Sequence, residues 1–146
     1  MRLIKYNHKY KEKFMSLLIN EEDKTFIEDP VLTLEEYAKK AYGIKWEIFL
    51  FEVEEIIGYY MIGVNRDSDL FLDRFLIDGR KKGKGYGRLM FQLLLDQIKK
   101  DHEDINNLYL SVNPNNTHAI HFYEHVGFIL TPYTDDDELI YHYKIR

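Results

Sequence analysis

Asp78-Gly-Arg-Lys-Lys-Gly-Lys-Gly-Tyr-Gly-Arg88 is a basic, glycine-rich run that separates an apolar segment, 69–77, from a long amphipathic one, 83–100. The apolar periodicity on either side predicts a strand before the run and a helix after it. Unpaired N–H groups and the positive dipole end of a helix start attract anions, and glycines let a ligand approach the backbone. We therefore expect a phosphate or pyrophosphate site here; the alternative is a solvated basic turn.

Two familiar phosphate-binding loops do not match this run. A Walker loop needs four residues between its glycines and a hydroxyl residue after the lysine, but Gly79 and Gly83 are one residue too close and Gly85 follows Lys84. A dinucleotide loop needs Gly-x-Gly-x-x-Gly, whereas 83–87 reads Gly-x-Gly-x-Gly. Neither kind of nucleotide site is expected.

The charges of the chain are unevenly distributed. The 146 residues carry a net charge of −5, yet residues 79–100 hold seven basic side chains against one acid. That segment is therefore +6 and the remainder −11, which suggests two ligands of opposite sign. A broad basic face is missing, so nucleic acid is not an expected partner.

Composition excludes several classes of protein. Cysteine is absent, which rules out disulfides, a thiolate nucleophile and Cys-ligated metals. His121 and His125 have the spacing of a metal pair, but no third ligand accompanies them, so no metal is expected. No apolar run is long enough to cross a bilayer, and the first residues do not resemble a signal peptide, so we expect a cytoplasmic protein without membrane contact. The length predicts a single domain, 1–146, which could form a homodimer.

The remaining periodicities complete an α+β pattern, a mixed order of strands and helices. Strands are expected at 3–6, 47–53, 56–64, 69–77, 108–112, 128–130 and 139–145, and helices at 9–19, 33–42, 83–100 and 117–125. The first helix should bury Phe14, Leu17 and Leu18, and a capping box of Thr33 and Glu36 should open the second. Residues 21–30 are acidic and read as a loop or broken helix.

Two motifs resemble those of the GNAT superfamily of acetyl-CoA-dependent N-acetyltransferases. The first, Lys82-x-x-Gly85-x-Gly87, is similar to the family's Gln/Arg-x-x-Gly-x-Gly/Ala loop; Arg80-x-x-Gly83-x-Gly85 is a second possible register, but it leaves a shorter turn after Ile77. The second motif runs from Asn116 to Phe128 and is similar to Asn-x-x-Ala-x-x-x-Tyr-x-x-x-Gly-Phe. The resemblance covers about residues 70–130 and implies a mixed, mostly antiparallel sheet flanked by helices.

The resemblance also implies which residues bind acetyl-CoA. In the family the glycine loop binds the pyrophosphate, the Asn lies along the pantetheine arm, and N–H groups at the end of the preceding strand stabilise the oxyanion. The corresponding residues here are Phe75, Leu76, Ile77, Lys82, Gly83, Lys84, Gly85, Tyr86, Gly87, Arg88, Asn116 and Tyr123.

Tyr123 and Asp73 are the candidate catalytic residues. The resemblance implies that the Tyr123 hydroxyl protonates the leaving thiolate, which is feasible because a thiol and a phenol differ by only about 1.5 pKa units. Strand alternation would place Phe71, Asp73, Phe75 and Ile77 on one face, where Asp73 could hold or deprotonate the amine. A structural ion pair with Arg74 is the equally weighted alternative for Asp73.

The acceptor is expected to be a small amine. The sequences Phe-Leu-Asp-Arg-Phe-Leu-Ile-Asp and Leu-Tyr-Leu-Ser-Val-Asn-Pro resemble the bacterial spermine/spermidine (diamine) acetyltransferase branch of the family. The acids that would then bind the polyamine are Glu21, Glu22, Asp23, Glu28 and Asp29 of the N-terminal loop, and Asp73. The acidic run 135–138 is either a further site that recruits cations or a solvated turn. A protein N-terminus, an aminoglycoside or a non-catalytic acyl-CoA-binding role are the alternatives.

Overall fold

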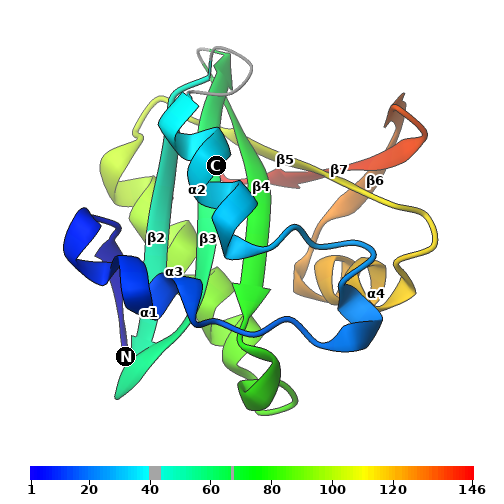
Figure 1. The fold of residues 1–146 in the computed structure, drawn as a ribbon. Helices are drawn as coiled ribbons and strands as arrows, with labels where there is room; N and C mark the ends of the chain where they lie inside the picture. The colour runs from blue at the N-terminus through cyan, green and yellow to red at the C-terminus, as the bar shows by residue number, and fades with distance from the viewer. Residues whose placement is uncertain (40–43, 67) are drawn as a thin grey trace.

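A mixed sheet lies between two layers of helices in the computed structural model, with α1 and α2 in front of the sheet and α3 behind it in Figure 1. The structure describes residues 1–39, 44–66 and 68–146. Within these residues, seven strands pair in the order β1-β2-β3-β4-β5-β7-β6, and only β4 and β5 run parallel. The predicted α+β class, a mostly antiparallel sheet flanked by helices, is confirmed.

The elements follow the predicted order. The strands are β1 (Arg2–Lys5), β2 (Trp46–Val53), β3 (Glu55–Arg66), β4 (Asp69–Ile77), β5 (Asn107–Val112), β6 (Ile129–Asp135) and β7 (Glu138–Lys144). The helices are α1 (Lys11–Met15), α2 (Pro30–Lys39), α3 (Tyr86–Asp101) and α4 (Thr117–Val126), with short 3-10 turns at His8–Tyr10, Glu21–Asp23 and Gly79–Lys81. No helix of the described residues has both the length and the hydropathy to cross a membrane.

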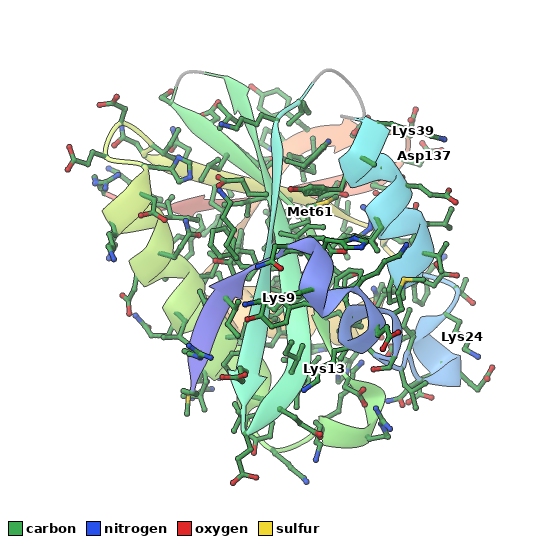
Figure 2. All side chains as sticks on the ribbon, turned by 60° about the vertical axis from the view of Figure 1, so that its left-hand side comes forward. Lys9, Lys13, Lys24, Lys39, Met61 and Asp137 are labelled. Atoms are coloured by element: carbon green, nitrogen blue, oxygen red, sulfur yellow. The ribbon has the colours of Figure 1, made fainter. Side chains whose placement is uncertain are left out.

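Each face of the sheet has its own hydrophobic core. Met90, Leu94 and Ile98 of α3 are fully buried against one face, where the apolar side of α4 also packs. Phe14 of α1 packs against the opposite face together with Met61, which Figure 2 shows in the middle of the sheet. Strand β4 contributes residues to both cores, whereas the buried residues of β5 belong to the α3 side. The functional site described below forms where these two strands separate.

The first helix is shorter than predicted. It ends at Met15 rather than residue 19, and Leu18 is 49% exposed although Phe14 and Leu17 are buried as expected. The reason is a tether to the glycine-rich loop: the Leu18 N–H donates to Asp78 Oδ2 (3.2 Å) and its carbonyl accepts from Gly79 N–H (2.8 Å). These bonds hold the N-terminal segment against the start of the loop.

The capping box predicted at Thr33 is wrong. The helix begins at Pro30, and Asp29 caps it by accepting from the Leu32 N–H (3.0 Å), an arrangement typical of Asp followed by Pro at a helix start. Thr33 is instead fully buried, and its hydroxyl shares a 3.0 Å hydrogen bond with the Tyr59 hydroxyl. The predicted end of this helix, at Tyr42, lies outside the described residues.

The C-terminal hairpin is longer than the apolar pattern suggested. Strand β6 extends to Asp135, and Asp136 and Asp137 form the turn with φ angles of 46° and 67°. Both residues are in the left-handed region, which short polar side chains such as Asp tolerate and which matches the twist of a two-residue hairpin. The acidic run 135–138 is therefore the tip of the β6–β7 hairpin.

Candidate active site

The start of α3 presents a row of free backbone donors. Gly85 is the N-terminal cap with φ of 81°, and the first intrahelical bond runs from Leu89 N–H to the Gly85 carbonyl (3.3 Å). The N–H groups of Tyr86, Gly87 and Arg88 therefore have no carbonyl in the preceding turn to bind. Gly85, the capping residue, has no side chain that could accept a hydrogen bond from them. A Cβ built at Gly83 or Gly85 would meet nothing within 4 Å, so the space before the helix is open.

The two left-handed glycines also explain why α3 begins at Tyr86, three residues later than predicted. Gly83 has φ of 79° and Gly85 has φ of 81°, conformations outside a right-handed helix. The structure thereby places Gly85 and Gly87 at the helix start, as the Lys82-x-x-Gly85-x-Gly87 register requires. Arg80, of the other register, is held by Asp78, and this guanidinium keeps the pKa of Asp78 below its usual value.

A cavity of about 470 Å³ opens in front of these donors. It is lined by Phe75, Leu76 and Ile77 of β4, by the loop and helix start, and by Asn116, Ala119, Phe122 and Tyr123 around α4. Of the residues predicted to bind acetyl-CoA, all but Lys84 line it. We call it the cofactor cavity.

Basic side chains at the cofactor cavity are held by partners from other elements. Lys82 forms an ion pair with Asp23, and Arg88 lies against the imidazole of His125. The cavity thus combines free N–H donors, glycines that let a ligand approach the backbone closely, and cationic side chains. Together these features fit a pyrophosphate.

The sheet opens beside this cavity because β4 and β5 diverge. They pair only where Asp69–Phe71 face Asn107–Tyr109. Asp78 N–H donates to the Ile57 carbonyl (2.7 Å), and antiparallel alternation then points the N–H groups of Phe75 and Ile77 away from β3, toward the opening. The same alternation points the Leu76 N–H toward β3. Phe75 and Ile77 are therefore the free donors of the predicted trio.

Tyr123 projects from α4 into the opening. The helix is capped by Asn116, whose Oδ1 accepts from Ala119 N–H (3.3 Å), and ends at Gly127 with φ of 119°. The tyrosine ring lies edge-on to Phe75 and Phe128, with centroids 6.4 and 5.6 Å away. Burial among these rings raises the pKa of the Tyr123 phenol above its ordinary value, so the hydroxyl keeps its proton at neutral pH.

A second cavity, of about 250 Å³, adjoins the cofactor cavity at Tyr123. It shares Ile27, Phe75, Leu76, Asn116, Ala119 and Tyr123 with the cofactor cavity. Its polar lining includes the carboxylates of Glu28, Asp73 and Glu138 and the guanidinium of Arg74. We call it the acceptor cavity, because a cation beside Tyr123 would enter from this side.

The acceptor cavity continues into a third hollow, of about 730 Å³, that reaches the hairpin tip. The two share Asp73, Ser111, Asn113 and Glu138. Asp135, Asp136 and Asp137 line the outer part. We call this hollow the acidic groove; it reaches Phe71 and Asp73 of β4 and Ser111 near the end of β5.

The expected alternation along β4 is wrong because the strand contains a bulge. Met61 of β3 faces Arg74 while the next residue, Ile62, faces Leu72, so Asp73 is an extra residue. After it the faces exchange: Phe71 packs with the α1 and α2 layer, but Phe75 and Ile77 pack with the α3 layer. Asp73 does line the acceptor cavity, where it forms an ion pair with Arg74, the alternative the sequence left open.

The N-terminal acids Glu21, Glu22 and Asp23 lie elsewhere. Asp23 lines the cofactor cavity and is paired with Lys82. Glu21 pairs at 2.6 Å with Lys24, which Figure 2 shows at the outer edge of the molecule. Neither Glu21 nor Glu22 lines the acceptor cavity. Of the acids that the sequence offered to a polyamine, Glu28, Asp73 and Glu138 line the acceptor cavity. The sequence did not indicate that Arg74 pairs with Glu28 and Glu36 as well as with Asp73.

Metal ligands do not gather in the part of the chain that the structure describes: no three His, Cys, Asp or Glu side chains there could hold an ion. His125, one of the two histidines with metal-pair spacing, contacts Arg88.

Comparison with known proteins gives consistent results. The sequence profile of the acetyltransferase (GNAT) family matches residues 11–128. A spermine/spermidine N(1)-acetyltransferase of Bacillus subtilis (strain 168) is 31% identical over 121 residues, 78% of each chain. A PaiA N-acetyltransferase of Thermoplasma acidophilum, solved with coenzyme A, superposes with a TM-score of 0.70 at 18% identity over 98% of both chains. A spermidine N-acetyltransferase of Vibrio cholerae, solved with CoA and spermine, superposes with a TM-score of 0.71 at 17% identity, over 97% of this chain and 94% of that chain.

Proposed function

The chain belongs to the acetyltransferase (GNAT) family and is an acetyl-CoA-dependent N-acetyltransferase, and from this premise we propose that it acetylates a polyamine such as spermine or spermidine. One observation carries the proposal: Tyr123 lines both the cavity with free N–H donors for an anion and the cavity with carboxylates. A ligand that carries a pyrophosphate, bound in the first cavity, and a cationic ligand, bound in the second, would meet at the Tyr123 hydroxyl. We further propose that residues 1–146 act as one catalytic domain.

Acetyl-CoA supplies an activated acetyl thioester, and the chain positions it. The N–H groups of Tyr86, Gly87 and Arg88 would bind the pyrophosphate, with Lys82 adding charge. The N–H groups of Phe75 and Ile77, which face the opening between β4 and β5, would donate to the carbonyl oxygen as it gains negative charge.

Tyr123 is proposed as the general acid. Its hydroxyl would give a proton to the departing sulfur, and no described residue forms a hydrogen bond that would hold it away from the opening. The apolar surroundings that raise the phenol pKa would raise that of a thiol beside it in the same direction, so the small difference between the two groups is retained.

The acidic groove supports a polyamine as the acceptor. A polyamine carries several hydrated ammonium groups, and binding must replace that hydration with carboxylates spaced along its length. Beyond Asp73 and Glu138, the groove offers Asp135, Asp136 and Asp137. We therefore propose that the remote ammonium groups lie along this groove, and not against Glu21 and Glu22 as the sequence suggested. The B. subtilis relative carries the name of a spermine/spermidine acetyltransferase, which supports the same substrate class.

Substrate preference tests this assignment. At low ionic strength, kcat/KM for spermine is expected to exceed that for butylamine by at least about tenfold, because the exposed carboxylates of the groove attract each additional charge. Raising the salt concentration to about 0.5 M should shrink this gap, chiefly through the KM for spermine, since the Debye length falls to a few ångströms.

A matched pair of variants locates the effect. Neutralising Asp135, Asp136 and Asp137 together to Asn should raise KM for spermine and leave that for butylamine nearly unchanged, with the affinity for acetyl-CoA constant. Neutralising Glu21 and Glu22 to Gln is the control for lost surface charge and should change neither. Equal kcat/KM for the two amines at low salt would contradict the polyamine assignment and leave a protein N-terminus or an aminoglycoside as the acceptor to be tried.

A further inference from the structure

Three carboxylate side chains line the acceptor cavity together with Tyr123, and their surroundings differ. Glu28 comes from the segment before α2, Asp73 from the bulge of β4 and Glu138 from the first position of β7. The role expected of Asp73, to hold the amine and take its proton, requires a carboxylate that is free to bind a cation.

Two of these carboxylates form ion pairs with Arg74. This side chain is only 10% exposed, and its guanidinium forms ion pairs with Asp73, Glu28 and Glu36, the last at 2.9 Å. Because a buried guanidinium keeps its charge and holds carboxylates with directed N–H groups, an incoming ammonium would have to compete with it for Asp73 and Glu28.

Glu138 is not paired in this way. Its Oε1 accepts a hydrogen bond from the Ser111 hydroxyl on the neighbouring strand β5 (3.1 Å), which fixes the orientation of the carboxylate. None of the ion pairs found among residues 1–39, 44–66 and 68–146 includes Glu138, so the second oxygen remains available. Glu138 lines both the acceptor cavity and the acidic groove and thus stands on the path of the substrate.

We propose that Glu138, and not Asp73, binds the acceptor nitrogen beside Tyr123 and accepts its proton; this inference rests on the proposed acetyl transfer. Glu138 first takes a proton from the bound ammonium group, which frees the nitrogen lone pair, and passes that proton to water. The lone pair then forms a bond to the acetyl carbon, and a second N–H proton passes to Glu138, directly or through one water. The C–S bond breaks, and the sulfur takes the Tyr123 proton. Water then returns a proton to Tyr123 and removes one from Glu138, so the amine and thioester become an amide and a thiol.

The charges around Glu138 favour this role. On its own hairpin lie Asp135, Asp136 and Asp137, and across the cavity lie Asp73 and Glu28 with Arg74 between them. The titratable hydroxyls facing the same space are Tyr59 and Tyr123. Negative charge therefore prevails around Glu138, which concentrates an ammonium group at the carboxylate without a fixed cation.

Glu138→Gln keeps the size of the side chain but removes the base. We expect kcat to fall at least about tenfold with the best amine substrate, with the KM for acetyl-CoA unchanged. Glu138→Asp should recover part of the loss, and Asp73→Asn should lose less than Glu138→Gln. Glu12→Gln, which removes an exposed acid from α1, is the control for a lost charge and should match the unaltered protein.

Chemical rescue separates a missing base from a disturbed structure. Formate should raise the rate of Glu138→Ala at least about threefold, whereas it should not accelerate Asp73→Ala or the unaltered protein. The inference is overturned if Glu138→Gln stays within threefold of the unaltered rate, or if formate fails to rescue Glu138→Ala. Activity of the unaltered protein with a polyamine tests the proposed function itself, so the two claims can fail separately.

Discussion

Tyr123→Phe is expected to lower kcat by at least about 10²-fold while leaving the affinity for acetyl-CoA nearly intact. The substitution removes one hydroxyl and keeps the ring that packs between Phe75 and Phe128. The thiolate would then leave without a proton in a cavity with an apolar lining, where an unpaired charge is most costly. Steady-state kinetics of CoA release and calorimetric titration with acetyl-CoA measure the two quantities.

Tyr133→Phe is the matched control for this substitution. Tyr133 is 70% exposed on β6 and lines neither the cofactor nor the acceptor cavity, so the loss of its hydroxyl should leave kcat unchanged. If Tyr123→Phe retained its kcat under conditions where chemistry is rate-limiting, the proton would have to come from water or another residue, and the role given to Tyr123 would be wrong.

Gly85→Val should weaken acetyl-CoA binding by about 10²-fold, the second large effect. A β-branched side chain is strained at φ of 81°, and its Cβ would project into the open space where the pyrophosphate is proposed to bind. A loss of 10²-fold corresponds to about 2.7 kcal/mol, which the displaced anion contacts and the backbone strain supply together. Isothermal titration calorimetry of the folded variant provides the number.

Gly85→Ala separates the two contributions. It shares the left-handed strain but adds a single methyl group, so its affinity should fall less than that of the valine variant. Circular dichroism and the urea midpoint establish that both variants are folded. An unchanged dissociation constant for folded Gly85→Val would place the pyrophosphate somewhere other than the start of α3.

The sequence predicts those parts of the fold that depend on local patterns. Strand β4 has the expected bounds because its apolar residues are flanked by an unambiguous loop. The bulge at Asp73 was not predictable, since it appears only when β4 is registered against β3. The start of α2 was misplaced because an Asp-Pro cap and a capping box compete within four residues, and burial of Thr33 against Tyr59 favours the former.

The two halves of the site differ in the same way. The cofactor half consists largely of backbone groups around glycines at every second position, 83, 85 and 87, so the spacing of the motif predicts it. The acceptor half is assembled from β4, β7 and the segment before α2, and its charges depend on ion pairs between distant residues such as Arg74 and Glu36. Acid-rich composition indicated a cationic ligand but could not show that Asp23 faces Lys82 while Glu138 faces Tyr123's cavity.

The central claim is that acetyl-CoA and a polyamine bind in the two cavities that meet at Tyr123, and that the acetyl group passes from one to the other there. Acetyl transfer to spermine tests this claim most directly. The purified protein is incubated with acetyl-CoA and spermine, and the released CoA and the acetylated amine are quantified together. The account predicts equal amounts of both products, formation that depends on both substrates, and their loss in Tyr123→Phe. CoA release without acetylated spermine, or binding of acetyl-CoA with no turnover by any amine, would contradict it.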